Sequence, residues 1–295
     1  MQAVILITHI ESDAVGQHFD RLNFECSGLL DAFLCVHGPA AADAGKALRA
    51  DFRISPADEQ RSLPLRYAEK MRRGGSAIPG FPDLIYMPVL RDRLTQYTHI
   101  WIMEYDVDFA GAWGDFFAPL IGSAADLMGT TIYPRSQCAD WMWWPSFETP
   151  TEVSDRDHMR AFFPIARFSR RMIECYAAAV QTGDWRGHAE ALYPTVARHR
   201  GLTIEDIGGD GPFTPKPLRG KNYFNNPADG RLRPGSLTTR PPQQTLYFHV
   251  APETFPMRGY LYHPVKVHDG LDAADPIVDM TRWANDPTRS DGERA

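Results

Sequence analysis

The sequence predicts an α/β fold, with a mostly parallel sheet covered by helices on both faces. Residues 3–10 form a short apolar run rich in β-branched side chains, which is typical of a buried strand, and residues 31–37 are expected to form a second strand that ends at Gly38-Pro39. A third strong strand is expected at residues 98–105. Segments with helical spacing separate these runs, and strands that alternate with helices along a chain commonly pair in parallel.

The other expected elements follow in chain order. In the first hundred residues we expect helices at 13–29, 40–50, 66–73 and 84–93, and a short strand at 52–54. Beyond residue 109 we expect a helical turn at 115–120, a strand at 129–134, and helices at 162–181 and 187–200. The helix at 162–181 is amphipathic, because its apolar side chains recur at helical spacing. Strands are expected again at 244–250 and 259–267.

The length of 295 residues is enough for one large domain with a sizeable core. We expect a single domain over residues 1–285 and a tail at 286–295. Residues 208–242 are rich in Gly, Pro, Asn and Arg and show little apolar periodicity. Because so long a loop in a compact domain is commonly functional or disordered, we predict a mobile loop there. A passive surface loop is the alternative.

Composition argues against several classes of protein. The net charge is −6 and the basic residues are scattered, so no nucleic-acid partner is expected. The four cysteines lie far apart without a C-x-x-C pair, which disfavours both thiolate zinc and a disulfide framework. No apolar run is long enough for a transmembrane segment, and no leader-like segment opens the chain. We therefore expect a cytoplasmic protein, and peripheral attachment to a membrane through partners stays open.

The segment from His99 to Phe109 is the most informative part of the sequence. If it continues as a strand, Glu104, Asp106 and Asp108 share one face, and no Lys or Arg lies in the segment. Three carboxylates at the end of a parallel strand repel one another unless they are protonated, solvated or bound to a cation. Oxygen ligands favour Mg²⁺ or Mn²⁺. A solvated acidic cap on the strand is the alternative.

Asp106-Val107-Asp108, placed after a hydrophobic strand about a hundred residues from a strand-first start, resembles the D-x-D motif of GT-A glycosyltransferases. The resemblance covers residues 3–200 in organisation. It implies a Rossmann-like sheet, a nucleotide-binding half at about 1–110 and an acceptor half at about 111–285. It also implies that Asp106 and Asp108 hold Mn²⁺ or Mg²⁺, which bridges the two phosphates of a UDP- or GDP-sugar donor.

The same resemblance implies which residues contact the nucleotide. The family's first strand and the loop after it bind the nucleotide, which points to Thr8, His9 and Ile10. The end of its second strand lies near the base or the ribose, which points to Val36 and His37. A histidine at either position is also common as a purely structural residue.

Trp185-Arg-Gly187-His188-Ala-Glu190 resembles the W-x-G-x-x-[ED] motif of inverting GT-A enzymes, whose last carboxylate removes the acceptor proton. This implies that Glu190 is the catalytic base. The segment carries one carboxylate where many relatives carry two. A helix N-terminus stabilises a carboxylate in any protein, so an ordinary first-turn glutamate is the alternative.

Tyr262-His263-Pro264-Val265-Lys266 follows the predicted mobile loop. In many GT-A enzymes a histidine from the C-terminal part completes the metal shell, which implies this role for His263, and Lys266 is expected at the diphosphate. An imidazole beside two carboxylates suits Mn²⁺ better than Mg²⁺. A histidine before proline is also common in extended linkers.

These features together predict a metal-dependent, inverting glycosyltransferase that moves a sugar to an acceptor hydroxyl, commonly of a carbohydrate. Trp113, Trp141, Trp143 and Trp144 either line the acceptor groove or pack in the core. Two alternatives stay open. A metal-dependent phosphoester hydrolase or nucleotidyltransferase would also use paired aspartates, and a non-catalytic carbohydrate-binding protein would explain the tryptophans.

Overall fold

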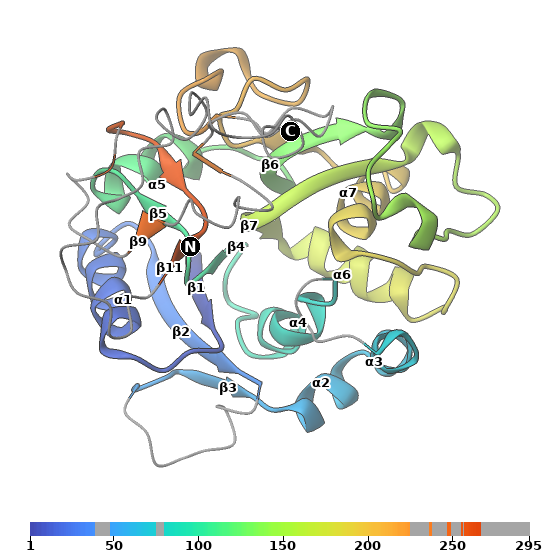
Figure 1. Ribbon diagram of the computed structural model, residues 1–295, viewed down its shortest axis with the longest axis horizontal. Helices are drawn as coiled ribbons and strands as arrows, with labels where there is room; N and C mark the ends of the chain where they lie inside the picture. Colours follow the sequence, from blue (N-terminus) through green and yellow to red (C-terminus); the bar gives the residue numbers. More distant parts are fainter. Residues whose placement is uncertain are drawn as a thin grey trace, which may run out of the picture.

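The computed structural model describes residues 1–38, 48–74, 80–224, 236–237, 247–248, 255 and 257–266. Its centre is a seven-stranded sheet in the order β3-β2-β1-β4-β7-β6-β8 (Figure 1). The strands are β1 (Gln2–Thr8), β2 (Asp31–His37), β3 (Phe52–Ile54), β4 (His99–Glu104), β6 (Leu127–Pro134), β7 (Met159–Ser169) and β8 (Ile204–Asp206). Only β7 runs antiparallel to its neighbours β4 and β6. The predicted α/β class with a mostly parallel sheet is confirmed.

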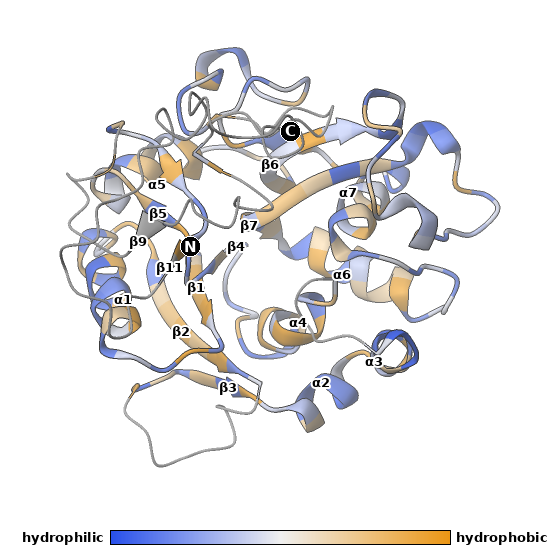
Figure 2. Cartoon of the chain, viewed as in Figure 1, coloured by the Kyte–Doolittle hydropathy of each residue, from blue (hydrophilic) through white to orange (hydrophobic). Residues whose placement is uncertain are grey.

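Helices cover both faces of this sheet, also as predicted. One face packs against α1 (Asp13–Glu25) and α5 (Trp113–Ile121), and the other against α4 (Asp83–Asp92), α6 (Arg170–Val180) and α7 (Ala189–His199). Alternation along β4 divides the two cores, because Ile100 and Ile102 enter one while Trp101 and Met103 enter the other. Figure 2 shows the hydrophobic residues along β1, β2 and β7.

The remaining elements are short. Helices α2 (Pro56–Ser62) and α3 (Pro64–Arg73) lie beside α4 (Figure 1), and single 3₁₀ turns occur at η2 (Arg135–Gln137), η3 (Trp144–Ser146), η4 (Asp155–Asp157) and η5 (Lys216–Leu218). Strand β5 (Asp108–Phe109) pairs with β10 (Leu261–Tyr262), and β9 (Tyr247–Phe248) pairs with β11 (Val265–Lys266). Among the described residues, no helix is both long and apolar enough to cross a lipid bilayer.

The helix predicted at 162–181 is wrong over its first half. Residues up to Ser169 belong to β7, and only Arg170–Val180 form the helix α6. All eleven residues of β7 are buried between β4 and β6, so apolar side chains point to both faces and the alternation of a half-exposed strand is lost. Pro164 is tolerated because it falls where the β6–β7 register shifts.

Other differences concern the ends of elements. The strand predicted at 98–105 ends at Glu104, and the helix at 13–29 ends at Glu25. Helix α2 was not predicted, although Ser55 and Asp58 form a capping box at its start. Most of the helix expected at 40–50, and the tail at 286–295, lie outside the described residues.

The start of the predicted mobile loop at 208–242 is packed against the domain. Tyr223 is fully buried, its hydroxyl donates to Asp206, and Thr214 is also buried. Residues 225–235 and 238–242 lie outside the described part of the chain. The mobility of the loop stays a prediction.

The order of strands places a crevice between β1 and β4. From β1 the chain crosses to β2 and β3 on one side, and then returns to β4 on the other side of β1. Helices that follow strands on opposite sides of such a point diverge, and ligands bind outside the carboxyl ends of the strands there. Thr8 and Glu104 end these two strands, so the crevice opens directly beyond them.

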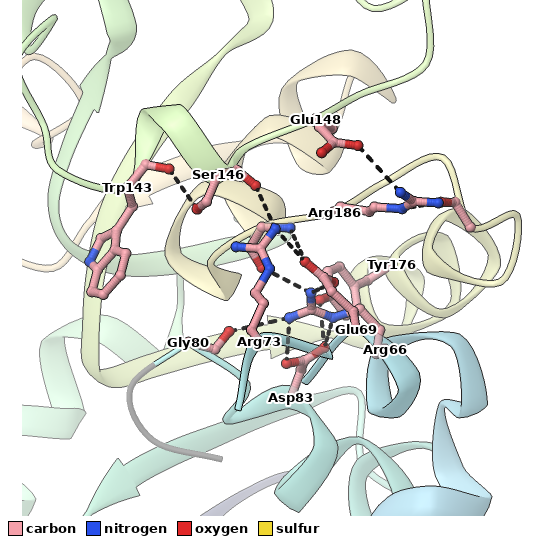
Figure 3. A network of polar contacts seen from close by, with 12 residues as sticks. Arg66, Glu69, Arg73, Gly80, Asp83, Trp143, Ser146, Glu148, Tyr176 and Arg186 are labelled. Carbon is pink, nitrogen blue, oxygen red and sulfur yellow. Dashed lines mark hydrogen bonds and ion pairs between the residues drawn. The ribbon is translucent and has the colours of Figure 1, made fainter. Parts of the chain in front are cut away.

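A buried ionic network joins the helices of one face to the turn before α7 (Figure 3). The guanidinium of Arg66 donates two hydrogen bonds to Asp83, at 2.8 and 3.0 Å, and one to Glu69. It also donates to the carbonyl of Gly187 at 2.9 Å, while Glu69 accepts from the amide of Gly187. Tyr176 from α6 donates to Asp83. The network therefore sets where α7 begins.

We predict that Arg66→Met destabilises the protein by about 3–5 kcal/mol, because two buried carboxylates lose their cation. Urea unfolding followed by circular dichroism measures the change. Arg61→Met is the matched control, since Arg61 is exposed and its ion pair with Asp58 contributes about 0–1 kcal/mol. Equal stability of the two variants would contradict the role given to the network.

Candidate functional site

The carboxyl ends of β1, β2 and β4 bring three aromatic side chains together. The ring of His9 lies 5.2 Å from that of Tyr105 and 5.7 Å from that of His37. His37 is buried, and this burial, with the charges of His9 and Lys70, lowers its pKa to about 4. A neutral imidazole therefore faces His9 at neutral pH.

The side chains of the other predicted nucleotide contacts, Thr8, Ile10 and Val36, are less exposed to solvent than that of His9. The hydroxyl of Thr8 is buried and bonds to both the amide and the carbonyl of Ile10. This turn shapes the exit from β1, whereas Val36 is fully buried in β2. Ile10 is partly exposed, so among these three it has side-chain surface for a ligand.

Glu104, Asp106 and His263 form a group that could hold a metal ion. One ligand atom from each lies within 4.8 Å of the other two. The Nε2 atom of His263 is 3.5 Å from a carboxylate oxygen of Glu104 and 3.5 Å from one of Asp106. Ligands at right angles around Mn²⁺ at ordinary distances lie roughly 3 Å apart, so a small rearrangement would let all three bind one ion. Two carboxylates and an imidazole are a suitable donor set for Mn²⁺.

Without a metal, a proton takes the place of the ion. Burial alone would lower the pKa of His263, but the charges of Asp106 and Glu104 and hydrogen bonds to them raise it to about 10. The imidazolium then neutralises part of the carboxylate charge. Because a metal-bound imidazole must be neutral, the metal and this proton exclude each other.

His263 reaches the group through backbone pairing at the end of the described chain. Strand β10 pairs with β5, with Tyr262 opposite Asp108. The amide of Val265 donates to the carbonyl of Asp106 at 2.7 Å, which fixes the next turn of chain on the site. The ring of Phe162 lies 5.2 Å from that of His263 and packs against its edge. Lys266 belongs to β11, and its side chain lies outside the described part of the structure.

Asp108, which the D-x-D motif predicts as a metal ligand, does not belong to this group in the structure. Its carboxylate accepts hydrogen bonds from Arg21 on α1 and from the amide of Phe109, and His18 lies 3.9 Å away. The physical reason is that β4 ends at Glu104. The turn that follows breaks the alternation, so the carboxylates after it no longer share a face.

Glu190 stands in the first turn of α7 and is electrostatically coupled to the same group. Its side chain is 15 % exposed, and this burial, with the charge of Glu104, raises its pKa to about 8, against the opposing charges of Arg160 and His263. The amide of Phe163 donates weakly to its Oε1 atom, at 3.5 Å. A carboxyl group with a pKa near the working pH is suited to general acid or base catalysis.

The backbone around Gly187 determines how α7 enters the site. Gly187 has φ +122°, and a Cβ there would lie 2.9 Å from the Cα of Phe147 and 3.0 Å from the carbonyl of Ser146. The glycine of the W-x-G pattern is therefore required by packing, because a larger residue at position 187 would clash with the backbone of residues 146 and 147. Trp185 is 3 % exposed and belongs to the core, where it is unable to stack on a sugar.

The four tryptophans that were expected either in an acceptor groove or in the core fall into two pairs. Trp113 and Trp144 are buried in the core, while Trp141 and Trp143 are partly exposed beside His188 at the start of α7.

Two residues of the site were not predicted. Glu104 was noted only as part of an acidic face, and Arg160 was missed because its strand was not recognised.

We predict that Glu190 makes stability fall as the pH rises. Between pH 4.5, its ordinary pKa, and about 8, the folded protein holds a proton that the unfolded chain has lost, so the free energy of unfolding falls by up to about 1.4 kcal/mol per pH unit. Glu190→Gln should remove this slope and stabilise the protein most at pH 8. Denaturant unfolding at pH 5 and pH 8 measures it, with exposed Glu152→Gln as the control. Parallel pH profiles for wild type and Glu190→Gln would contradict the prediction.

Comparisons with known proteins show a distant likeness in structure and none in sequence. No family model matches the chain, and no curated protein matches its sequence. Among solved structures, the chain is similar to the apo form of mouse xyloside xylosyltransferase 1. The similarity has a TM-score of 0.37 and 12 % sequence identity, and it covers 70 % of this chain and 86 % of that one.

Proposed function

We propose that the protein is a metal-dependent glycosyltransferase that transfers a sugar from a nucleoside-diphosphate sugar to an acceptor hydroxyl. The observation that carries this proposal is the convergence of Glu104, Asp106 and His263 at the crevice between β1 and β4. A group that could hold a metal ion lies there, at the carboxyl ends of two central strands, where open α/β sheets bind ligands. Glu190, a carboxyl group with a raised pKa, is coupled to the same charges.

In this proposal Glu104, Asp106 and His263 hold Mn²⁺ or Mg²⁺, and Asp108 anchors the segment through Arg21. The ion would stabilise the negative charge that develops on the leaving diphosphate. His9, His37 and Tyr105 surround the proposed nucleotide site, with Thr8, Ile10 and Val36 shaping its wall.

Glu190 would accept the proton of the attacking hydroxyl. Ionised Glu190 would lie near the protonated imidazole of His263 when no metal is present, and near the metal charge when one is bound. Either positive charge favours the carboxylate form that a base requires. Attack on the side opposite the leaving diphosphate inverts the configuration at the sugar carbon. Lys266 is proposed at the diphosphate from its sequence position alone.

A two-metal phosphoester hydrolase is the main competing proposal, and it would need a second cluster of ligands. In the part of the chain that the structure describes, Glu104, Asp106 and His263 are the one such group. Calorimetric titration with UDP and GDP, with and without Mn²⁺, tests the glycosyltransferase directly. Nucleotide binding that is equal in EDTA and in Mn²⁺ would contradict it.

We predict that Asp106→Asn weakens Mn²⁺ binding by at least about tenfold, or about 1.4 kcal/mol. Asp108→Asn should leave Mn²⁺ affinity within about twofold and instead lower the melting temperature, because it breaks the pairing with Arg21. Calorimetry with Mn²⁺ and thermal unfolding of both variants provide the two readouts. A similar loss of Mn²⁺ affinity in both variants would favour the ligand pair of the sequence motif over the one proposed here.

We predict that Glu190→Gln lowers kcat by about 10²–10⁴-fold, the usual contribution of a general base, with little change in nucleotide affinity. For wild type, kcat should rise with pH up to about 8 as Glu190 loses its proton. Steady-state assays of sugar transfer across pH 6 to 9 measure both. Near-normal turnover of Glu190→Gln would contradict a catalytic role, and Glu190 would then be an ordinary carboxylate in the first turn of a helix.

A further inference from the structure

Arg160, the second residue of β7, is a buried cation without an ion pair among the described residues, and the charge of Glu190 acts on it only from a longer distance. Its side chain is 7 % exposed, and its Nε atom has no hydrogen-bond partner. Among the described residues, no carboxylate comes within ion-pair distance of its guanidinium. Its Cζ atom lies over the ring of Trp141, 5.4 Å from the ring centroid. Because an unpaired buried charge is costly, this guanidinium is suited to receive an anion from outside the chain.

His188 provides a second buried polar atom next to the same ring. Its Nδ1 atom accepts a hydrogen bond from the amide of Glu190 at 3.2 Å, so in the neutral ring the proton is on Nε2. Burial and the charge of Arg66 lower its pKa to about 3, which keeps the ring neutral. The Nε2 atom is buried, and within the described residues it has no acceptor.

Two tryptophans bring these groups into one place. The ring of His188 lies 6.1 Å from that of Trp141 and is stacked 4.6 Å from that of Trp143. Both indoles are partly exposed, so they offer apolar surface to a ligand. Figure 3 shows Trp143 beside the network that fixes the turn before α7.

This cluster lies on the opposite side of the metal group from the proposed nucleotide contacts. Arg160 lies on β7, the strand beside β4, and is paired with Tyr133 of β6, whereas His9 follows β1 and His37 ends β2 on the other side of β4. The anion for Arg160 is therefore assigned to a molecule on the side of the site where Glu190 begins α7, because Arg160 acts on Glu190 and shares the ring of Trp141 with His188.

We propose that Arg160, His188, Trp141 and Trp143 form the acceptor site, and that the acceptor is a sugar carrying an anionic group. This inference rests on the proposed glycosyltransferase function and specifies its second substrate. The anionic group pairs with the guanidinium of Arg160, and the Nε2 atom of His188 donates to a ring oxygen or hydroxyl. The exposed indole surface covers the apolar face of the sugar ring, next to Glu190.

The test compares ligands that differ mainly in charge. Wild type with UDP or GDP and Mn²⁺ is titrated with methyl β-glucuronide, glucose 6-phosphate and methyl β-glucoside, and binding is followed by tryptophan fluorescence and ligand-detected NMR. We expect at least one acidic sugar to bind about tenfold or more tightly than the neutral glucoside. The carboxylate and phosphate arms distinguish the two sources of charge. Arg160→Gln should abolish the preference and Arg160→Lys should keep part of it, while Arg156→Gln, at an exposed position, is the matched control.

Equal binding of acidic and neutral sugars by wild type would overturn the inference, without need of any variant that folds poorly. So would a preference that survives in folded Arg160→Gln. Nucleotide binding to wild type in Mn²⁺ is measured in parallel. If it is absent, the proposed glycosyltransferase function fails. If it is present while the acidic preference is missing, only the acceptor assignment fails.

Discussion

The buried guanidinium of Arg66 is the contact on which the candidate site depends. It joins α3 to α4 through Asp83, and it holds the backbone of Gly187 on the turn before α7. All five of its donor hydrogens have carboxylate or carbonyl acceptors nearby, so the charge is fully compensated inside the protein. These hydrogen bonds hold the first turn of α7, and with it Glu190, near the carboxyl end of β4.

The candidate metal group depends on a different kind of balance. Glu104 ends β4 and Asp106 lies two residues later in the turn, and their mutual repulsion is relieved by a positive charge on His263. A proton can supply that charge and so can a divalent ion. The fold therefore tolerates the site in either state, and the donor's own charge would favour the metal-bound one. Arg160 contrasts with Arg66, because among the described residues it forms no ion pair and the charge of Glu190 acts on it only from a longer distance.

The sequence revealed the strands that end at the crevice, because β1, β2 and β4 are apolar runs whose limits are marked by polar residues or glycine. It also singled out Asp106 and His263, whose proximity depends on pairing between segments some 150 residues apart, which no local pattern encodes. The expected ligand set contains Asp108, whereas the group in the structure contains Glu104, because alternation was extended past the end of β4. Arg160 was missed for a related reason: β7 is buried on both faces, so its apolar spacing resembled that of a helix.

The late position of His263 in the chain has a consequence for biosynthesis. All seven strands of the main sheet and the helices on its faces are complete by residue 206, whereas His263, the third member of the candidate metal group, arrives with the segment at 261–265. A nascent chain can thus form its scaffold on the ribosome while its two acidic residues still lack their third partner. Loading of the metal would follow release of this segment, so the ion would meet a folded protein and would not direct its folding.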